Sequence, residues 1–476
     1  MISNIIKQGS HYISGSLLIA VAGIVSFPIF TRLLPLEQYG LLSLITTLIG
    51  LMVATHKFGL QQSVIRYYSS SIKFFRSTVL SIYLLNVFIT FIVYFGIYSL
   101  IEYFHPGYIP KSFFIPLYLS SALQSYRLIM ISYFASDQKT KTVNIFNVLQ
   151  RYSSIALMVL SILFFEKDAG NILYAILISE IIFVILILLY RVEKYEGIKL
   201  KPSIAKKIVI YSFPLMVVEV FQIAHAFIDR FIISYYLDNK AVAFYSAPYS
   251  IADIISTVLL GSISAALIPI YMRLWNENRK DKIEELLSKV SDYFLLFYPV
   301  VIVGSYLISE PLMLILASEK YVESANILPL ALAGVAIFSS TFIYSAGLKL
   351  KENQNITMYF VFESLVINIL LNILLIGPYG IYGSAFSTII SYLWMAVRFY
   401  MRSRKVININ FNIIQFIKGG FISVAMYAAS TFIVTEVNSV VDLILQIFVA
   451  VTVSVICIVI IDRNIRRKIA TSIYTL

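Results

Sequence analysis

One apolar segment of this chain, residues 208–237, carries a row of polar and ionisable side chains: Glu219, Gln222, His225, Asp229 and Arg230. At about 100° per residue, the five lie within roughly 140° of one helix face. An ionisable group inside hydrocarbon costs several kcal/mol unless it is paired or hydrated. This face therefore predicts the lining of an aqueous cavity, where acids bind cations or protons and arginine binds anions. An internal salt-bridge network is the alternative, and five groups on one face favour the cavity.

Two other segments show the same kind of polar row. Residues 143–165 carry Asn144, Asn147, Arg151 and Ser154, and residues 113–134 carry Ser120, Gln124 and Arg127. Arginine stays charged and binds carboxylate or phosphate oxygens in a bidentate manner. Two roles stay open for these arginines: one of them forms an ion pair with Glu180 of the segment 171–190, or they contact an anionic substrate.

Acidic and amide groups recur in the second half of the chain. Asp253 lies in one apolar segment, and Glu363 neighbours a row of Ser364, Asn368 and Asn372 in another. Five of these ionisable groups are candidates for binding Na⁺ or H⁺, or else for forming salt bridges: Glu219, His225, Asp229, Asp253 and Glu363. No metal or other cofactor is expected, because the four histidines are not paired at i, i+4 and the single cysteine lies in an apolar run.

About fourteen apolar segments position these residues, and each is long enough to cross a bilayer. Their predicted bounds are 11–33, 38–58, 78–101, 113–134, 143–165, 171–190, 208–237, 243–272, 291–316, 325–347, 356–376, 381–401, 413–434 and 440–461. The apolar runs are continuous rather than alternating, which favours helices over a barrel. With 59% hydrophobic and 13% charged residues, the chain is predicted to be an all-α integral membrane protein.

The distribution of basic residues predicts orientation. With the N-terminus inside, only five of the 37 Lys and Arg fall outside and four within spans, namely Arg32, Lys111, Lys167, Lys240 and Lys320, and Arg127, Arg151, Arg230 and Lys418. Basic loops stay cytoplasmic, so both termini are expected in the cytoplasm, with the chain crossing the plasma membrane many times. The net charge of +12 is then an orientation signal, and no nucleic-acid partner is expected.

An internal repeat is visible at an offset of 210 residues, as between Lys139 and Lys349, and between Gly170 and Gly380. It predicts two parallel six-helix repeats, a transporter architecture, followed by two additional C-terminal helices. The predicted organisation is a lobe over 1–190, a basic cytoplasmic linker over 191–207, a lobe over 208–405, and two helices with a basic tail over 406–476.

One inside loop, residues 273–290, has a helical apolar stripe: Ile283, Leu286, Leu287 and Val290. The stripe predicts an amphipathic helix on the inner membrane surface. No Walker A sequence, HExxH motif or nucleophile elbow occurs in the chain, so an enzyme is not expected. Transport would draw on an ion gradient, the membrane potential or substrate flux.

Five groups of residues together resemble a known family: Phe27-Pro28-Ile29-Phe30-Thr31-Arg32-Leu33-Leu34 with Tyr39-Gly40; Phe213-Pro214 with Asp229-Arg230-Phe231-Ile232-Ile233 and Tyr245; Pro269 with Arg273; Gly347 with Lys349, Lys351 and Asn353; and Asn368, Asn372, Pro378, Tyr379-Gly380-Ile381, Gly383 and Ala385. In this order they resemble the Wzx-type polysaccharide (O-antigen repeat-unit) flippases. These belong to the multidrug/oligosaccharidyl-lipid/polysaccharide (MOP) exporter superfamily. The resemblance covers nearly the whole chain.

The resemblance implies two six-helix lobes around a cavity lined mainly by the first, second, seventh and eighth spans. It implies that undecaprenyl-pyrophosphate-linked oligosaccharide moves from the inner to the outer face by alternating access, as in O-antigen and lipopolysaccharide synthesis. Candidate cations for the pyrophosphate are Arg32, Lys57, Arg66 and Arg230, with Arg127 and Arg151 on helices behind the cavity. The implied partners are the lipid-linked substrate, membrane lipids, a polysaccharide polymerase and chain-length machinery.

Three alternatives stay open. A MATE-like multidrug exporter would favour cations, but Arg127 and Arg151 against the single embedded acid Glu180 favour an anionic substrate. A lipid II flippase would place several arginines in the first span, where this chain has only Arg32, at the outer end. A membrane component of polysaccharide assembly that transports nothing is the third.

Overall fold

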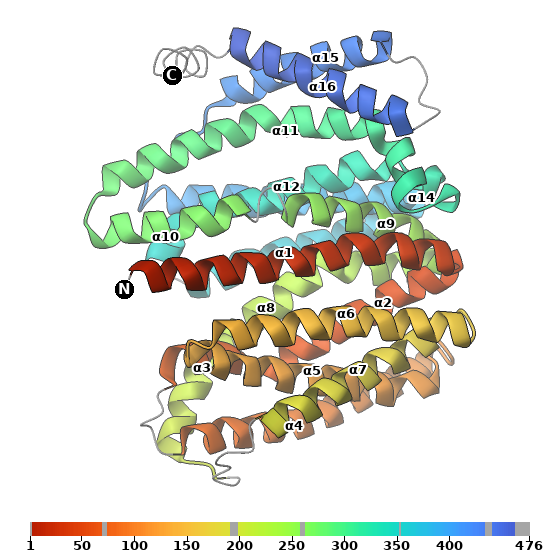
Figure 1. Ribbon diagram of the computed structural model, residues 1–476, viewed down its shortest axis with the longest axis vertical. Coiled ribbons are helices and arrows are strands. Elements are labelled where there is room, and N and C mark those ends of the chain that lie inside the picture. Colours follow the sequence, from red (N-terminus) through yellow and green to blue (C-terminus); the bar gives the residue numbers. More distant parts are fainter. Residues whose placement is uncertain are drawn as a thin grey trace. The chain divides into compact units, whose positions relative to one another are not determined.

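The computed structural model describes residues 2–68, 74–190, 199–257, 262–351, 354–433 and 440–461. Throughout these ranges the regular structure is helical, without strands (Figure 1). The prediction of an all-α integral membrane protein is confirmed. Asn353, residues 191–198 of the predicted linker, and residues 462–476 of the predicted basic tail lie outside the described ranges.

Two compact units divide the chain, Met1–Ala243 and Phe244–Leu476. The helices of the first unit are α1 (Ile2–Leu33), α2 (Leu36–Lys57), α3 (Leu60–Tyr67), α4 (Phe75–Phe104), α5 (Lys111–Ser136), α6 (Thr140–Phe164), α7 (Ala169–Tyr190) and α8 (Pro202–Tyr236). α9 (Asn239–Ser256) begins in the first unit and continues into the second. The lobe boundaries predicted from the repeat describe a different division, and they stay a prediction.

The second unit continues with α10 (Ser262–Asn276), α11 (Lys280–Leu316), the 3₁₀ helix η2 (Glu319–Ser324), α12 (Ile327–Tyr344), α13 (Ala346–Leu350), α14 (Gln354–Ser403), α15 (Ile413–Ile433) and α16 (Val440–Ile461). Every predicted span falls on one of these helices or on those of the first unit. The predicted span 243–272 corresponds to α9 and α10, with residues 258–261 between them outside the described ranges.

Ten helices of the described chain are long and apolar enough to cross a membrane. The count is lower than fourteen for four reasons. α14 is counted once although it holds two predicted spans, and the predicted span 243–272 is divided between α9 and α10, neither of which is both long and apolar enough. Only Leu17–Leu33 of α1 meets the apolar requirement, and α5 contains many serine and tyrosine residues.

The 50-residue helix α14 has a single break at Gly380, with φ 57° and ψ −140°. An unbroken helix of this length would extend about 75 Å, against about 30 Å of hydrocarbon. The break follows Pro378, and only glycine adopts this backbone conformation without strain. The break therefore divides α14 into two spans, in agreement with the predicted spans 356–376 and 381–401.

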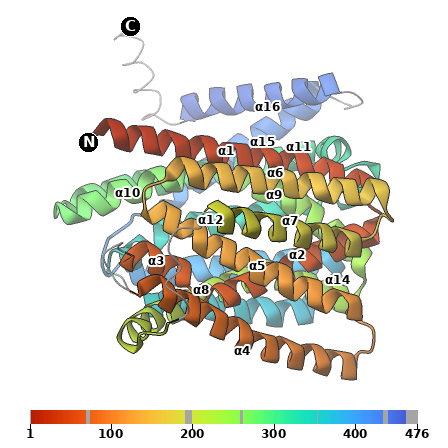
Figure 2. The same ribbon diagram turned by 60° about the horizontal axis from the view of Figure 1, so that its bottom comes forward.

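α2 lies at the centre of the first unit. It packs against α4, α5, α7 and α8, while α1 packs along α6 (Figure 2). Most of α2 is buried, whereas α4 exposes large apolar side chains such as Phe88 and Ile92. A helix with this degree of burial can hold polar side chains away from lipid, which is where the candidate site is built.

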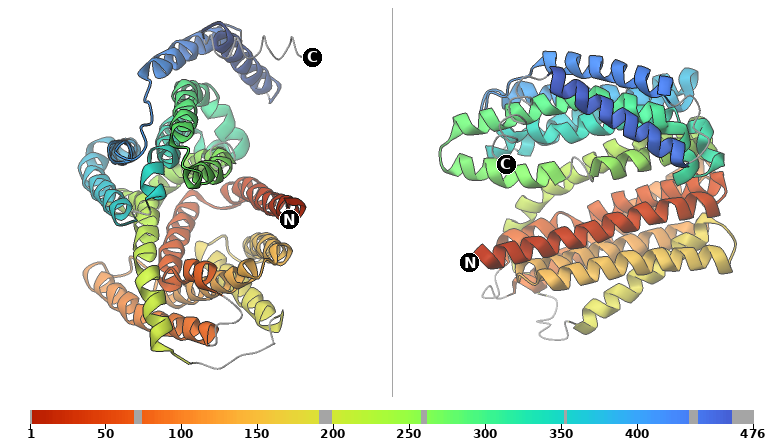
Figure 3. Two further views of the ribbon diagram at one scale, coloured as in Figure 1. Left: turned by 90° about the vertical axis from the view of Figure 1, so that its left-hand side faces the viewer. Right: turned by 45° about the horizontal axis from the view of Figure 1, so that its top comes forward.

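In the second unit, α11 packs against α12 and α15, and α15 and α16 lie side by side (Figure 3). Gly419 permits the close approach of α15, because a Cβ there would collide with the carbonyl of Leu296 on α11. Small residues at such contacts are typical of membrane helix pairs.

The predicted surface helix over 273–290 is wrong as a separate element. α11 runs without interruption from Lys280 to Leu316, and Ile283 and Leu287 are fully buried within the protein. Since no glycine or proline interrupts the chain between Lys280 and Tyr298, the amphipathic turn-by-turn pattern continues into the span. The apolar stripe therefore packs against protein rather than against the membrane surface.

Candidate functional site

Helices α2 and α8 lie antiparallel, with a series of polar contacts along their shared interface. From one end to the other, the pairs are Thr47 with Arg230 (Oγ1–Nη1, 3.5 Å), Lys57 with Glu219 (Nζ–Oε1, 2.6 Å) and Ser63 of α3 with Ser212 (Oγ–Oγ, 2.6 Å). We call this the α2–α8 interface. It brings predicted site residues from distant parts of the sequence together within the first unit.

Lys57 is the last residue of α2, and its ammonium group is paired with Glu219. The side chain of Lys57 is 8% exposed, while that of Glu219 is 32% exposed. A buried ammonium needs a counter-ion, and Glu219 provides one from the accessible side. An anion that reached this interface would therefore compete with Glu219 for Lys57.

Local backbone structure fixes the end of α2. The side-chain amide of Asn86 on α4 donates to the carbonyls of Thr55 (2.8 Å) and His56 (3.0 Å). Phe58 and Gly59 then adopt left-handed conformations, with φ of 52° and 66°. A helix commonly ends in this way, and glycine adopts the conformation without strain.

Gly59 also allows α8 to approach. A Cβ at this position would collide with the backbone of Ser212, whose hydroxyl donates to the Gly59 carbonyl (3.3 Å) and pairs with Ser63. Pro214 lies two residues farther along α8. The end of α2 and the proline-containing turn of α8 are thus held together by direct backbone contact.

Arg230 is the buried cation at the other end of the α2–α8 interface. It is 7% exposed, and its guanidinium lies over the ring of Phe227 at 4.4 Å. Thr47 is its side-chain hydrogen-bond partner, and Nε has none. Among the described residues, no carboxylate lies within ion-pair distance of Arg230. This contrasts with Lys57.

The acidic and imidazole groups near Arg230 are also enclosed. Asp229 is 1% exposed, and its Oδ1 accepts the backbone N–H of Arg230 at 2.8 Å. His225, one turn earlier, is 2% exposed. Of the predicted polar face of residues 208–237, His225, Asp229 and Arg230 are therefore buried in the protein, whereas Glu219 is half-buried and Gln222 is exposed.

The remaining cations of the first unit fall in different places. Arg66 on α3 lies over the ring of Tyr211 on α8 at 4.7 Å, which extends the α2–α8 interface beyond Lys57. Arg32 is exposed at the last turn of α1. The interface thus brings together Lys57, Arg66 and Arg230, while Arg32 lies at the end of α1.

Arg127 forms a buried bidentate ion pair with Glu180, with distances of 2.8 Å from Nε to Oε2 and 3.1 Å from Nη2 to Oε1. The side chains are 4% and 2% exposed, and Gln150 donates to the same carboxylate at 2.9 Å. Of the two roles open for the arginines, the structure shows the ion pair for Arg127. Arg151, half-buried on α6, has an Nε without a hydrogen-bond partner in the described chain.

In the second unit, Glu363 pairs with Arg398 at 2.9 Å, and Arg398 lies over the ring of Phe360 at 4.6 Å. Asp253 is exposed on α9. The neighbouring row of amides is fully buried and links the two parts of α14: Asn368 donates to the hydroxyls of Thr388 and Ser391, each at 3.3 Å. This row therefore holds helices together.

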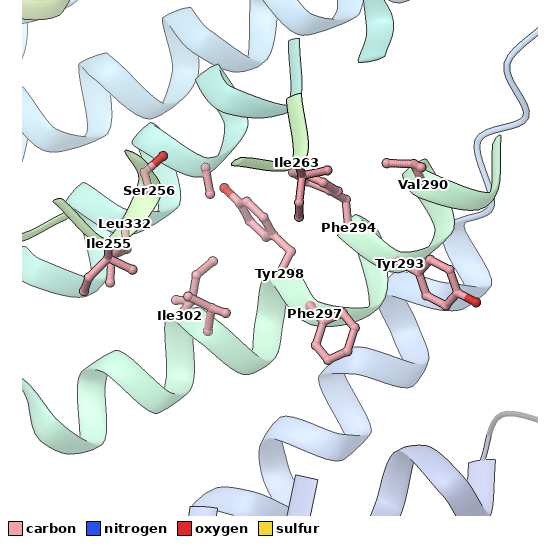
Figure 4. Close-up of a pocket in the computed structure, with 12 residues that line it drawn as sticks. Ile255, Ser256, Ile263, Val290, Tyr293, Phe294, Phe297, Tyr298, Ile302 and Leu332 are labelled. Atoms are coloured by element: carbon pink, nitrogen blue, oxygen red, sulfur yellow. The ribbon is translucent and has the colours of Figure 1, made fainter. Parts of the chain in front are cut away.

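An apolar pocket of about 390 Å³ lies in the second unit, between α9, α10, α11 and α12 (Figure 4). Tyr298 of α11 lines it, and its hydroxyl donates to the carbonyl of Ala333 on α12. A second apolar pocket of about 540 Å³ also includes Tyr298. The described residues that line the two pockets carry no charge, so neither suits a pyrophosphate.

His56 is a residue that the sequence analysis missed. It is fully buried between Tyr94 of α4 and Tyr118 of α5. Nothing at i±3 or i±4 marks it, because its neighbours come from helices far along the chain. For metals, the described residues contain no group of three or more His, Cys, Asp or Glu side chains that could hold an ion.

The sequence matches two models of known protein families. Residues 5–275 match the family model described as polysaccharide biosynthesis protein. The chain belongs to this family. Residues 214–374 also match the MatE family model.

Curated relatives agree with this assignment. The chain is 24% identical over 375 residues to the probable low-salt glycan biosynthesis flippase Agl15 of Haloferax volcanii, covering 76% of each chain. It is 23% identical over 418 residues, 81% of each chain, to the uncharacterized membrane protein MJ1068 of Methanocaldococcus jannaschii. The probable multidrug resistance protein YoeA of Bacillus subtilis matches over 219 residues at 28% identity, covering 44% of this chain and 47% of YoeA.

Solved structures share the fold. The lipid II flippase MurJ in an inward closed conformation superposes with a TM-score of 0.72 at 16% identity, covering 95% of this chain and 99% of that one. An inward-facing multidrug resistance MATE transporter of the MOP superfamily gives 0.66 at 14% identity, covering 82% and 94%. The predicted membership of this superfamily is confirmed. The named relatives and structures include flippases and a multidrug transporter.

Proposed function

We propose that this protein flips undecaprenyl-pyrophosphate-linked oligosaccharide repeat units from the cytoplasmic to the outer face of the plasma membrane by alternating access. The polysaccharide biosynthesis family and the glycan flippase relative support this class of substrate. The product would feed a surface polysaccharide such as O-antigen, with a polymerase and chain-length machinery acting afterwards.

The observation that carries the proposal is the buried guanidinium of Arg230, which hydrogen-bonds Thr47 but has no carboxylate partner within the described chain. Lys57, Arg127 and Arg398 each have a carboxylate partner, but Arg230 has none among the described residues. A buried cation without a counter-ion is destabilising, so its presence requires compensation from something that binds there. A pyrophosphate supplies that charge, and the guanidinium fork matches its oxygens.

The α2–α8 interface supports a path with two cationic positions. Lys57 and Arg66 lie toward one end and Arg230 toward the other. From Glu219, the partner of Lys57, to Arg230 is eleven residues of α8, or about 16 Å of helix. We assign the Lys57 end to the cytoplasm, so the pyrophosphate meets Lys57 first and Arg230 later.

Coupling follows from the same contacts. When the pyrophosphate takes Lys57, Glu219 loses its partner and becomes a group that can bind H⁺ or Na⁺. Asp229 and His225 lie in the corresponding place near Arg230. We propose that an ion gradient acts through these groups, with Asp253 and Glu363 as further candidates in the second unit.

The test is the sidedness of lipid-linked oligosaccharide in membrane vesicles. We expect vesicles without the protein to retain the substrate on the cytoplasmic face, and the wild-type protein to restore export. Arg230→Ala should abolish restoration while the protein remains in the membrane. Arg279→Ala is the control, because Arg279 already has a carboxylate partner in Glu277, which has no proposed role in coupling, and it should restore export. Normal export by Arg230→Ala would refute the role of Arg230.

A MATE-like multidrug exporter is the second candidate. The MatE match over residues 214–374 and the similarity to YoeA favour it. Oligosaccharide sidedness and drug resistance, measured together, distinguish the two functions. Unchanged oligosaccharide sidedness, together with protein-dependent resistance to cationic drugs, would establish the exporter instead.

A further inference from the structure

His56 is a histidine enclosed by aromatic rings near the end of α2. It is 0% exposed. The ring centroid of Tyr118 lies 4.9 Å away at an interplanar angle of 78°, and that of Tyr94 lies 5.9 Å away at 90°. Both rings contact the imidazole edge-on, which is a favourable packing of neutral aromatic groups.

Within the described residues, the two ring nitrogens of His56 lack the hydrogen bonds that a buried histidine ordinarily forms. Neither ring nitrogen has a hydrogen-bond partner of normal geometry in the described chain. The backbone of Ser121 on α5 is a polar group close to the ring. Buried polar nitrogens are nearly always paired. A histidine kept here without partners needs an explanation beyond packing.

The groups that face His56 do not favour a positive charge. From α4 comes Tyr94, whose hydroxyl bonds Thr55 at 2.6 Å, and from α5 comes Tyr118, whose hydroxyl donates to the carbonyl of Val87. On α2 itself, the next residue is the cation Lys57. No described carboxylate contacts the ring, so an imidazolium in this enclosure would be desolvated and unpaired.

His56 also occupies the point where α2 is attached to its neighbours. Asn86 holds the carbonyls of Thr55 and His56, and the left-handed Phe58 and Gly59 follow. If the ring left its aromatic enclosure, the end of α2 would separate from α4 and α5. Lys57 and its pairing with Glu219 would move with it.

We propose that His56 is a proton-binding site that couples proton uptake to movement of the inner end of α2. The imidazole is neutral in the enclosed conformation, and it is protonated in a second conformation where it reaches water. A proton that binds only one of two conformations shifts the population toward that one. Coupling to export rests on the proposed transport function, since it requires a transport cycle.

The experiment measures the distance between α3 and α4 by electron spin resonance. Spin labels are placed at Ile65→Cys and Leu85→Cys, two positions that are 55% and 56% exposed, in a Cys457→Ser background. Measurements are made on the full chain in lipid at about pH 8 and about pH 5.5, on either side of the usual histidine range near 6.5. We expect acidification to increase a second distance population at least about fivefold.

Two substitutions of His56 test the assignment. His56→Phe keeps an aromatic ring in the enclosure and cannot be protonated, so the pH response should be lost. His56→Gln serves the same purpose if the phenylalanine variant does not fold. His105→Gln is the matched control, because His105 is exposed although it also packs edge-on against a tyrosine, Tyr235, at 5.7 Å. The control should respond like the wild type.

Two results would overturn the proposal: a wild-type distance that is the same at both pH values, or a pH response that persists in both His56 variants. The measurement needs no substrate, so it is independent of oligosaccharide export. A His56-dependent shift without export would leave the proton site standing and refute the proposed substrate. Export with no His56-dependent shift would do the reverse.

Discussion

At the scale of single residues, we predict that export depends on the planar guanidinium of Arg230 and not only on its positive charge. Arg230→Lys keeps the positive charge but loses the bidentate fork and the stacking over Phe227. We expect export to fall at least about tenfold, corresponding to about 1.4 kcal/mol. The measurement is the initial rate of oligosaccharide export in vesicles. A variant that exports at the wild-type rate would show that charge alone is sufficient.

Lys57 and Glu219 make a second prediction, which separates packing from substrate binding. Lys57→Glu alone should remove both the ion pair and export. The double variant Lys57→Glu/Glu219→Lys restores opposite charges across the 2.6 Å contact, so its thermal stability should return toward that of the wild type. Export should stay lost, because the cation now lies on α8. Recovery of export would show that the pair is purely structural.

Arg127 and Glu180 are predicted to act on stability. Glu180→Gln leaves a buried guanidinium unpaired, which should cost about 3–5 kcal/mol. The readout is the thermal unfolding temperature of the purified protein. The control is Lys111→Ala, because Lys111 is 80% exposed and its pair with Glu102 should contribute about 0–1 kcal/mol. Equal shifts in the two variants would contradict the structural role of the Arg127–Glu180 pair.

At the scale of elements, the long apolar runs were enough to predict the spans. Each span must cross the bilayer as a helix, because its backbone groups can hydrogen-bond only to one another in lipid. α3 was missed because eight residues between spans carry no such requirement. The separate helix at 273–290 was wrong because periodicity does not indicate what a stripe packs against. The sequence raised an ion pair of Glu180 with one of two arginines without deciding which, and it gave no sign of the pair between Lys57 and Glu219, which are 162 residues apart. The enclosure of His56 by two distant tyrosines left no sequence signal.

A substitution at Gly59 tests the close contact at the α2–α8 interface. Gly59→Ala adds a Cβ that collides with the backbone of Ser212, at a residue whose φ is 66°. We expect a loss of about 1–2 kcal/mol or more, together with reduced export, since the two helices cannot keep their contact. Gly96→Ala is the control, because a Cβ there meets no atom within 4 Å and alanine favours the helix. If Gly59→Ala matches this control, close approach at Ser212 is unimportant.

At the scale of the whole molecule, the repeat at an offset of 210 relates helices beyond the residues that revealed it. The offset carries α4 onto α11, α5 onto α12, and α6 and α7 onto the two parts of α14. It also carries Gly170, at the start of α7, onto the break at Gly380. Architecture therefore repeats, while the charged contacts do not: position 20, the counterpart of Arg230, is Ala20.

Orientation in the membrane is the last prediction, and it determines the direction of the proposed transport. Lys206 is exposed at the start of α8, near the Lys57 end of the interface, and Lys111 is exposed as the first residue of α5. The distribution of basic residues predicts Lys206 inside and Lys111 outside. In a Cys457→Ser background, a membrane-impermeant maleimide should label Lys206→Cys only in inside-out vesicles and Lys111→Cys only in right-side-out vesicles. The opposite pattern would place Arg230 at the cytoplasmic end, so that a pyrophosphate arriving from the cytoplasm would meet Arg230 before Lys57.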